Sequence, residues 1–133
     1  MLSYRKGYLA ERDLVKVLGS RYDAHRVPLS GAVTGYEGDI ILHRDDKTYI
    51  CEVKIRKDAF RKIYRFVDKY DLVENGYRIT TLERWLEDIY APVMEFKIPK
   101  TIKDWLIDRD LLFFRSNYRS WLICEKDSSG QVS

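Results

Sequence analysis

The sequence predicts a single α/β or α+β domain with a mixed central β-sheet flanked by α-helices. Two observations carry this prediction. Apolar residues recur at helical spacing over residues 3–19, and strand-like alternation follows over residues 39–43 and 48–55. A chain of 133 residues, 45% of them hydrophobic, is long enough for one sheet and the helices that cover it.

The first half of the chain is expected to form a helix, three strands and a second helix. The helix of residues 3–19 ends at Gly19, where a residue without a side chain favours termination. A short strand over residues 22–28 and a glycine-containing loop follow, and residues 39–43 and 48–55 then form a hairpin. Residues 57–73 return to helical spacing and predict the second helix.

The second half is expected to hold a helical insert and two closing strands. Within the insert, about residues 77–108, the sequence predicts a helix over 81–90 with Thr81 as its N-cap and a short helix over 101–109. Residues 111–115 and 119–125 predict the closing hairpin. We therefore expect one domain over residues 1–126 and a loose tail over 127–133.

Composition excludes several classes of protein. No apolar run approaches the ~20 residues of a transmembrane helix, and the N-terminus lacks the apolar stretch of a secretory signal. Cys51 and Cys124 have no zinc-ligand spacing, so we expect both to be buried thiols. These features predict a cytoplasmic protein without a membrane partner.

Charge is unevenly distributed along the chain. Residues 1–65 hold 14 basic and 9 acidic residues, whereas residues 66–133 hold 10 and 12. The basic excess in the first half is compatible with a polyanionic partner.

The strand over residues 48–55 places two charged residues on one face. Side chains alternate along a strand, so Glu52 and Lys54 share a face with Ile50, and the opposite face is continuously apolar. Charges on a core strand are unfavourable unless they are paired or bind a ligand. A simple Glu–Lys ion pair at a solvated strand end would also explain them.

Asp39 favours the ligand-binding interpretation. It opens the neighbouring strand after Gly38, and the hairpin brings it beside Glu52. Adjacent carboxylates raise one another's pKa unless a cation lies between them. Hard oxygen ligands suit Mg²⁺, with Mn²⁺ as a substitute, and Lys54 would orient an attacking water or contact a phosphate oxygen.

Glu11 is a fourth candidate for the same site. It interrupts the apolar stripe that the first helix turns towards the sheet. An ion pair with Arg5 or Arg12 at the edge of the stripe is the alternative explanation.

These residues carry a family resemblance. Asp39, followed thirteen positions later by Glu52-Val53-Lys54, resembles the core of the PD-(D/E)xK nucleases. Upstream, Arg5-Lys6-Gly7, Ala10-Glu11-Arg12, Arg26 and Ser30-Gly31 resemble the archaeal Holliday junction resolvases in order and approximate spacing. The similarity covers residues 4 to about 57.

The resemblance implies a restriction-endonuclease-like core and an endonuclease that nicks four-way DNA junctions symmetrically as a homodimer. It implies an active site of Glu11, Asp39, Glu52 and Lys54, with metal held by the three acids. It also implies that Ser30 and Arg26 hold the scissile strand. Two alternatives remain: another nuclease of the same core that acts on duplex, nicked or single-stranded DNA, and a non-catalytic nucleic-acid-binding module.

Two basic groups are candidate DNA contacts. Lys57, Arg61, Arg65 and Lys69 recur every four residues and would form one stripe on the second helix. Arg5, Lys6 and Arg12 form another patch beside the expected site. A merely solvated helix face is the alternative for the stripe. The residues 111–114 are apolar without alternation, which suggests that a second subunit covers one face of that strand.

Overall fold

The computed structural model describes residues 2–27 and 39–126, and the described chain forms four helices and eight strands. The first half holds α1 (Leu2–Gly19), β1 (Asp23–Arg26), β2 (Ile40–Arg44), β3 (Lys47–Arg56), α2 (Arg61–Val67) and β4 (Asp71–Glu74). The second half holds β5 (Tyr77–Thr81), α3 (Leu82–Glu87), β6 (Val93–Glu95), α4 (Lys100–Trp105), β7 (Leu111–Ser116) and β8 (Leu122–Lys126).

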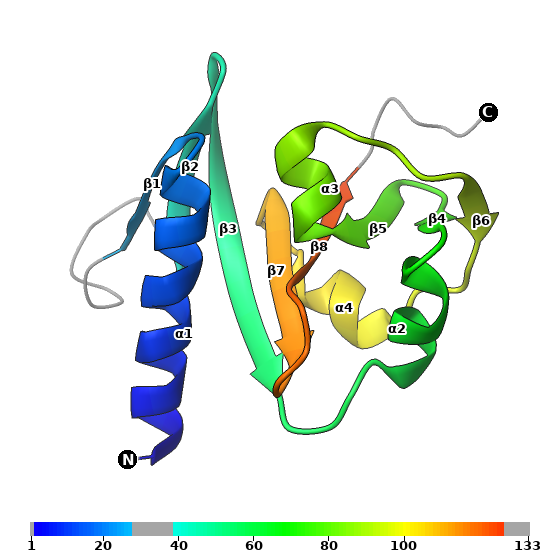
Figure 1. Cartoon of the computed structure of the whole chain (residues 1–133), viewed down its shortest axis with the longest axis horizontal. Helices are drawn as coiled ribbons and strands as arrows, with labels where there is room; N and C mark the ends of the chain where they lie inside the picture. The colour runs from blue at the N-terminus through cyan, green and yellow to red at the C-terminus, as the bar shows by residue number, and fades with distance from the viewer. Residues whose placement is uncertain (1, 28–38, 127–133) are drawn as a thin grey trace.

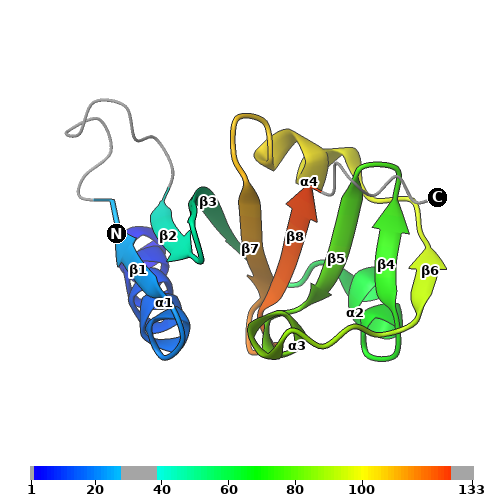
Figure 2. The ribbon, with the colours of Figure 1, turned by 90° about the horizontal axis from the view of Figure 1, so that it is seen from above.

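All the described strands belong to one mixed sheet with the order β1-β2-β3-β7-β8-β5-β4-β6, which Figure 2 shows from edge to edge. The antiparallel meander β1-β2-β3 joins the rest through the parallel pair β3–β7. A parallel pair needs a long crossover connection. Here that crossover is the whole segment from α2 to α4, so residues far apart in sequence meet at the β3–β7 boundary.

Two hydrophobic cores lie on the two faces of the sheet. Leu111 and Phe113 of β7 pack into a core with residues of α1 and α3, whereas Leu112 and Phe114 pack into a core with residues of α2 and α4. Successive side chains on a strand point to opposite faces, so β7 is buried on both sides. Figure 1 shows α1 beside β1–β3 and α2 and α4 at the other end of the molecule.

The predicted fold class is confirmed, and so are the first helix, the first three strands and the closing hairpin. The helix predicted over 57–73 is wrong at both ends, because only Arg61–Val67 is helical and Asp71–Glu74 forms β4. Phe60, at φ 64°, precedes the helix in the left-handed region. The turn at Asn75-Gly76, with Gly76 at φ 86°, joins β4 to β5. Asn-Gly is a strong hairpin signal, which the sequence prediction did not use.

The insert is not purely helical. α3 and α4 form where helices were expected, and Thr81 caps α3 by accepting a hydrogen bond from the Arg84 backbone N–H at 3.1 Å. The insert also contributes β5 and β6 to the sheet. The second subunit expected over residues 111–114 is not needed there either, because the chain itself buries all four side chains.

Two further expectations concern burial and the membrane. Cys51 and Cys124 are buried free thiols, as predicted. Within the described residues, none of the helices has the length and apolar character required to cross a membrane.

Candidate active site

The centre of the site is an ion pair on β3. Lys54 Nζ lies 3.2 Å from Glu52 Oε2, and the Glu52 side chain is only 16% exposed. In the β3–β7 register these residues pair with Leu112 and Phe114, which belong to the core of α2 and α4. Paired residues of parallel strands share a face, so Glu52 and Lys54 sit at the margin of that core, as the predicted alternation requires.

Arg109 adds a second cation that the sequence did not predict. Its Nε lies 2.9 Å from Glu52 Oε1, so each carboxylate oxygen of Glu52 has one cationic neighbour. The neighbouring Asp110 makes two hydrogen bonds with Ile50, each 2.8 Å: the Asp110 backbone N–H donates to the Ile50 carbonyl, and the Asp110 carboxylate accepts from the Ile50 N–H. Arg109 is 57 positions from Glu52, and only the parallel pairing of β3 with β7 brings them together; no local pattern signals it.

Asp39 lies at the entry to β2, beside β3. Its backbone N–H donates to the Cys51 carbonyl, and its Oδ2 accepts a hydrogen bond from the Val53 N–H, both at 2.8 Å. Ile40 pairs with Cys51, and continuing that register by one residue places Asp39 opposite Glu52. The hairpin therefore places Asp39 beside Glu52, as the sequence predicted.

Two acids, Glu52 and Glu11, and one cation, Lys54, act on the carboxyl group of Asp39. Burial, together with the negative charges of Glu52 and Glu11, raises the pKa of Asp39 from 3.8 to about 6. The Val53 N–H and the Lys54 ammonium act in the opposite direction and offset only part of the increase. An acid held near two other acids in a partly desolvated place is typical of a functional site.

Glu11 approaches the site from the first helix. It is on α1, and its Oε1 lies 3.0 Å from Arg26 Nε of β1. Arg26 is thus an ion-pair partner of Glu11, whereas the alternative explanation for Glu11 had named Arg5 or Arg12. Its charge acts on Asp39, so the structure brings Glu11 within electrostatic range of the acid that the hairpin supplies.

The donor chemistry of Asp39, Glu52 and Glu11 fits a hard divalent cation, since all three offer carboxylate oxygens. In the described part of the chain, however, no group of three or more His, Cys, Asp or Glu side chains is gathered closely enough to hold a metal. Glu52 is paired instead with Lys54 and Arg109, and Glu11 with Arg26.

The other predicted contacts are distributed as follows. Arg12 is exposed on α1, and Arg5 and Lys6 fall in the first turns of that helix. Ser30 lies outside the described residues. The basic stripe is broken: Arg61 and Arg65 are on α2, whereas Lys57 precedes it and Lys69 follows it, although all four are exposed.

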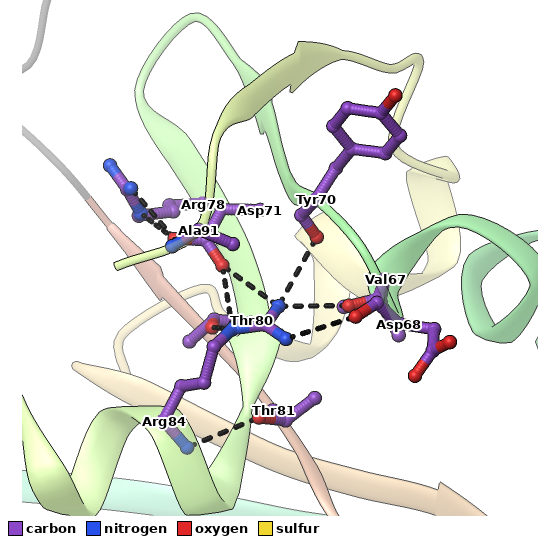
Figure 3. A network of polar contacts seen from close by, with 9 residues as sticks. All are labelled: Val67, Asp68, Tyr70, Asp71, Arg78, Thr80, Thr81, Arg84 and Ala91. Carbon is purple, nitrogen blue, oxygen red and sulfur yellow. Dashed lines mark hydrogen bonds and ion pairs between the residues drawn. The ribbon is translucent and has the colours of Figure 1, made fainter. Parts of the chain in front are cut away.

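A second charged cluster, around Asp71, contrasts with this site. Asp71 is fully buried and lies 2.7 Å from Arg78 Nη2 and 2.9 Å from Arg84 Nη2 (Figure 3). Arg84 also donates to the backbone carbonyls of Val67 and Tyr70, at 2.8 and 3.2 Å. Burial alone would raise the pKa of Asp71, but hydrogen bonds from Thr80, Arg78 and Arg84 hold it below its ordinary value.

Every group in the Asp71 cluster has its partner within the chain. The cluster ties the end of α2 to β4, β5 and α3, and the backbone N–H of Ala91 also points to Asp71 Oδ2, at 3.3 Å. We interpret it as a structural network rather than as a site.

Comparison with known proteins gives one family. A family model for the archaeal Holliday junction resolvase (Hjc) matches residues 2–74, slightly more than half of the chain. No curated protein matches the chain. The matched segment contains Glu11, Asp39, Glu52 and Lys54, and it ends before Arg109 and the β7–β8 hairpin.

Proposed function

Because the chain belongs to the archaeal Holliday junction resolvase family, we propose that it resolves four-way DNA junctions by paired, symmetric, Mg²⁺-dependent nicks. The family supports a nuclease that resolves Holliday junctions; the metal, the symmetry of the nicks and the site residues are the finer parts of the proposal. The observation that supports the metal and the site residues is the position of Asp39, whose pKa is raised by burial and by the charges of Glu52 and Glu11.

Asp39, Glu52 and Glu11 are the side chains that would hold the metal. When bound, Mg²⁺ would neutralise their charge, activate a water and stabilise negative charge on the phosphate. The pKa of about 6 means that Asp39 is ionised at neutral pH and is available as a ligand. Mn²⁺, which takes the same oxygen donors, would serve as a substitute.

Lys54 is the catalytic cation of the proposal. Its Nζ is next to Glu52, so it would face a phosphate oxygen of a strand lying across β3 and stabilise the charge that develops there. Glu52 holds this ammonium on the reacting side of the strand. Arg26 with Ser30 would position the scissile strand, and Arg5, Lys6 and Arg12 would contact neighbouring phosphates.

Two symmetric nicks need two active sites. One chain supplies one set of Glu11, Asp39, Glu52 and Lys54, and a four-way junction has approximate two-fold symmetry. A homodimer with an isologous interface would present two such sets to the two strands.

The proposal is tested with a synthetic four-way junction and a linear duplex of matched sequence, each with Mg²⁺ or with EDTA. We expect two symmetric nicks on the junction, none on the duplex and none with EDTA. Cutting of the linear duplex as well would indicate a less selective nuclease of the same core. A folded protein that binds the junction but never cuts it would contradict the nuclease assignment.

The site assignment is tested with Asp39→Asn, which removes a ligand charge but almost no volume. We expect cleavage to fall by at least about a thousandfold, while junction affinity stays within about twofold. Asp46→Asn, the same change at an exposed turn residue between β2 and β3, is the matched control and should cut normally. Normal cleavage by Asp39→Asn would disprove the assignment.

A further inference from the structure

Among the large hydrophobic residues of the described chain, Tyr118 is the most exposed, and it lies at the tip of the β7–β8 hairpin. Its residue surface is 99% exposed. Tyr118 also has φ 60°, in a turn closed by a hydrogen bond from the Arg119 N–H to the Ser116 carbonyl at 3.2 Å. Glycine or asparagine adopts this conformation more readily than a bulky residue does, so turn geometry does not explain a tyrosine here.

The hairpin beneath this ring is firmly anchored. The Tyr64 hydroxyl accepts a hydrogen bond from the Ser116 N–H at 3.1 Å and donates to the Ser120 carbonyl at 2.8 Å. The Asn117 N–H donates to the Arg56 carbonyl at 2.9 Å. Because hydrogen bonds fix the backbone on both sides of Tyr118, its exposed ring can bind a partner without a large loss of conformational entropy.

The surroundings of the tip are strongly basic. The segments 56–65 and 115–121 contain one acid, Asp58, which is paired with Arg61. They contain seven basic residues: Arg56, Lys57, Arg61, Lys62, Arg65, Arg115 and Arg119. Arg119 lies over the Tyr64 ring at 4.1 Å and Arg115 over the Trp121 ring at 5.0 Å. This charge is complementary to a nucleic-acid backbone.

The tip of the hairpin lies at the end of β3, the strand that carries Glu52 and Lys54 of the candidate active site. Arg56 pairs with Ser116 and shares its face of β3 with Glu52 and Lys54; Lys54 and Arg56 both lie near the Trp105 ring, at 5.8 and 4.8 Å. Figure 1 shows the β7–β8 turn beside the end of β3. The four residue steps of β3 from Glu52 to Arg56 span ~13 Å.

We propose that the β7–β8 hairpin is a wedge for branched DNA, in which Tyr118 stacks on a base at the branch point while Arg115 and Arg119 hold the flanking phosphates. Stacking is interrupted where the arms of a junction meet, so a base there is more easily exposed to an aromatic ring than a base within a duplex. This inference rests on the proposed junction substrate and adds the element that selects it.

The test uses the full chain in EDTA, so that binding is measured without cleavage. The probe is a four-way junction with 2-aminopurine at the branch point, and a linear duplex serves for comparison. We expect the wild type to change the 2-aminopurine fluorescence. Tyr118→Ala should abolish that change and weaken junction binding roughly tenfold, with duplex binding unaltered. Tyr118→Phe should restore both, because it keeps the ring.

Tyr90→Ala is the matched control, since Tyr90 is 67% exposed but lies after α3, away from the hairpin. It should leave the fluorescence change intact. Arg115→Gln and Arg119→Gln should each reduce the salt dependence of binding to both DNAs.

The outcomes distinguish a failure of the wedge from a failure of the proposed junction substrate or of the nuclease function. Equal loss of junction and duplex binding in Tyr118→Ala, or no loss of either, overturns the wedge. A wild type that binds the junction no better than the duplex overturns both the wedge and the proposed substrate. A wild type that binds and perturbs the branch point but cuts nothing with Mg²⁺ contradicts the nuclease function and leaves the wedge supported.

Discussion

Asp71 and Asp39 are two partly or fully buried aspartates of the same chain, and their pKa values move in opposite directions. Asp71 has Arg78 and Arg84 against its two oxygens, and these contacts and Thr80 overcome its burial. Asp39 has one backbone N–H, a lysine at longer range and two acids, so its burial prevails.

The difference distinguishes a structural network from a functional site. In the Asp71 cluster, the negative charge of Asp71 is compensated by Arg78 and Arg84 of the same chain. Around Asp39 the cations are engaged elsewhere, Arg26 with Glu11 and Arg109 with Glu52. The acids of the candidate site therefore retain an unfavourable interaction that an external cation would relieve.

Removing the carboxylate of Asp71 should have the largest effect on stability. Asp71→Ala leaves two buried guanidinium groups without their shared partner, so we expect the free energy of unfolding to fall by about 3–5 kcal/mol. Urea unfolding measured by circular dichroism checks this value. Asp46→Ala, at an exposed turn, should change it by less than about 0.5 kcal/mol. A loss of that small size in Asp71→Ala would mean that the network is not structural.

Asp39→Asn should change the free energy of unfolding in the opposite direction. The folded-state pKa of Asp39 is raised, so ionisation destabilises the fold, and the penalty grows as pH rises from about 4 to 6 and persists above 6. With solvent screening taken into account, Asp39→Asn should stabilise the protein by ~2 kcal/mol at pH 7.5 in EDTA.

The pH dependence sharpens this comparison. The gain from Asp39→Asn should shrink towards zero near pH 4, where Asp39 is protonated in both the folded and the unfolded chain. The contribution of Asp71, whose pKa is lowered, is present at neutral pH and is lost only as pH falls below about 4. A destabilised Asp39→Asn at pH 7.5 would contradict the unbalanced charge that we assign to the site.

Arg109→Gln should have the smallest effect on stability, about 1 kcal/mol, and a specific effect on the metal. It removes a cation 2.9 Å from Glu52, so the Mg²⁺ concentration that gives half-maximal cleavage should fall severalfold. A Mg²⁺ titration of junction cleavage measures this. Lys103→Gln breaks a comparable pair with Glu74 outside the site and should leave the Mg²⁺ dependence unchanged. An equal response in both variants would exclude a direct link between Arg109 and the metal ligands.

The parts of the molecule that sequence patterns predicted well depend on local periodicity. The helix through Glu11 and the hairpin that carries Asp39, Glu52 and Lys54 each lie within one or two neighbouring elements, where alternation determines which face a side chain occupies. The helix predicted over 57–73 is wrong at its end because Leu72 and Val73 suit either a helix or a strand, and pairing with β5 decided the outcome.

By itself, then, the sequence determined the fold class and the neighbourhood of Asp39, Glu52 and Lys54, because period and hairpin register are local properties. Only the tertiary structure decided that Arg109 reaches Glu52, that Arg26 holds Glu11 and that the β7–β8 hairpin meets the end of β3. Those contacts depend on the parallel pairing of β3 with β7 and on the packing of α1 against β1. Pairing over more than fifty residues is governed by burial of the whole sheet, so it leaves no periodic trace near the residues that it joins.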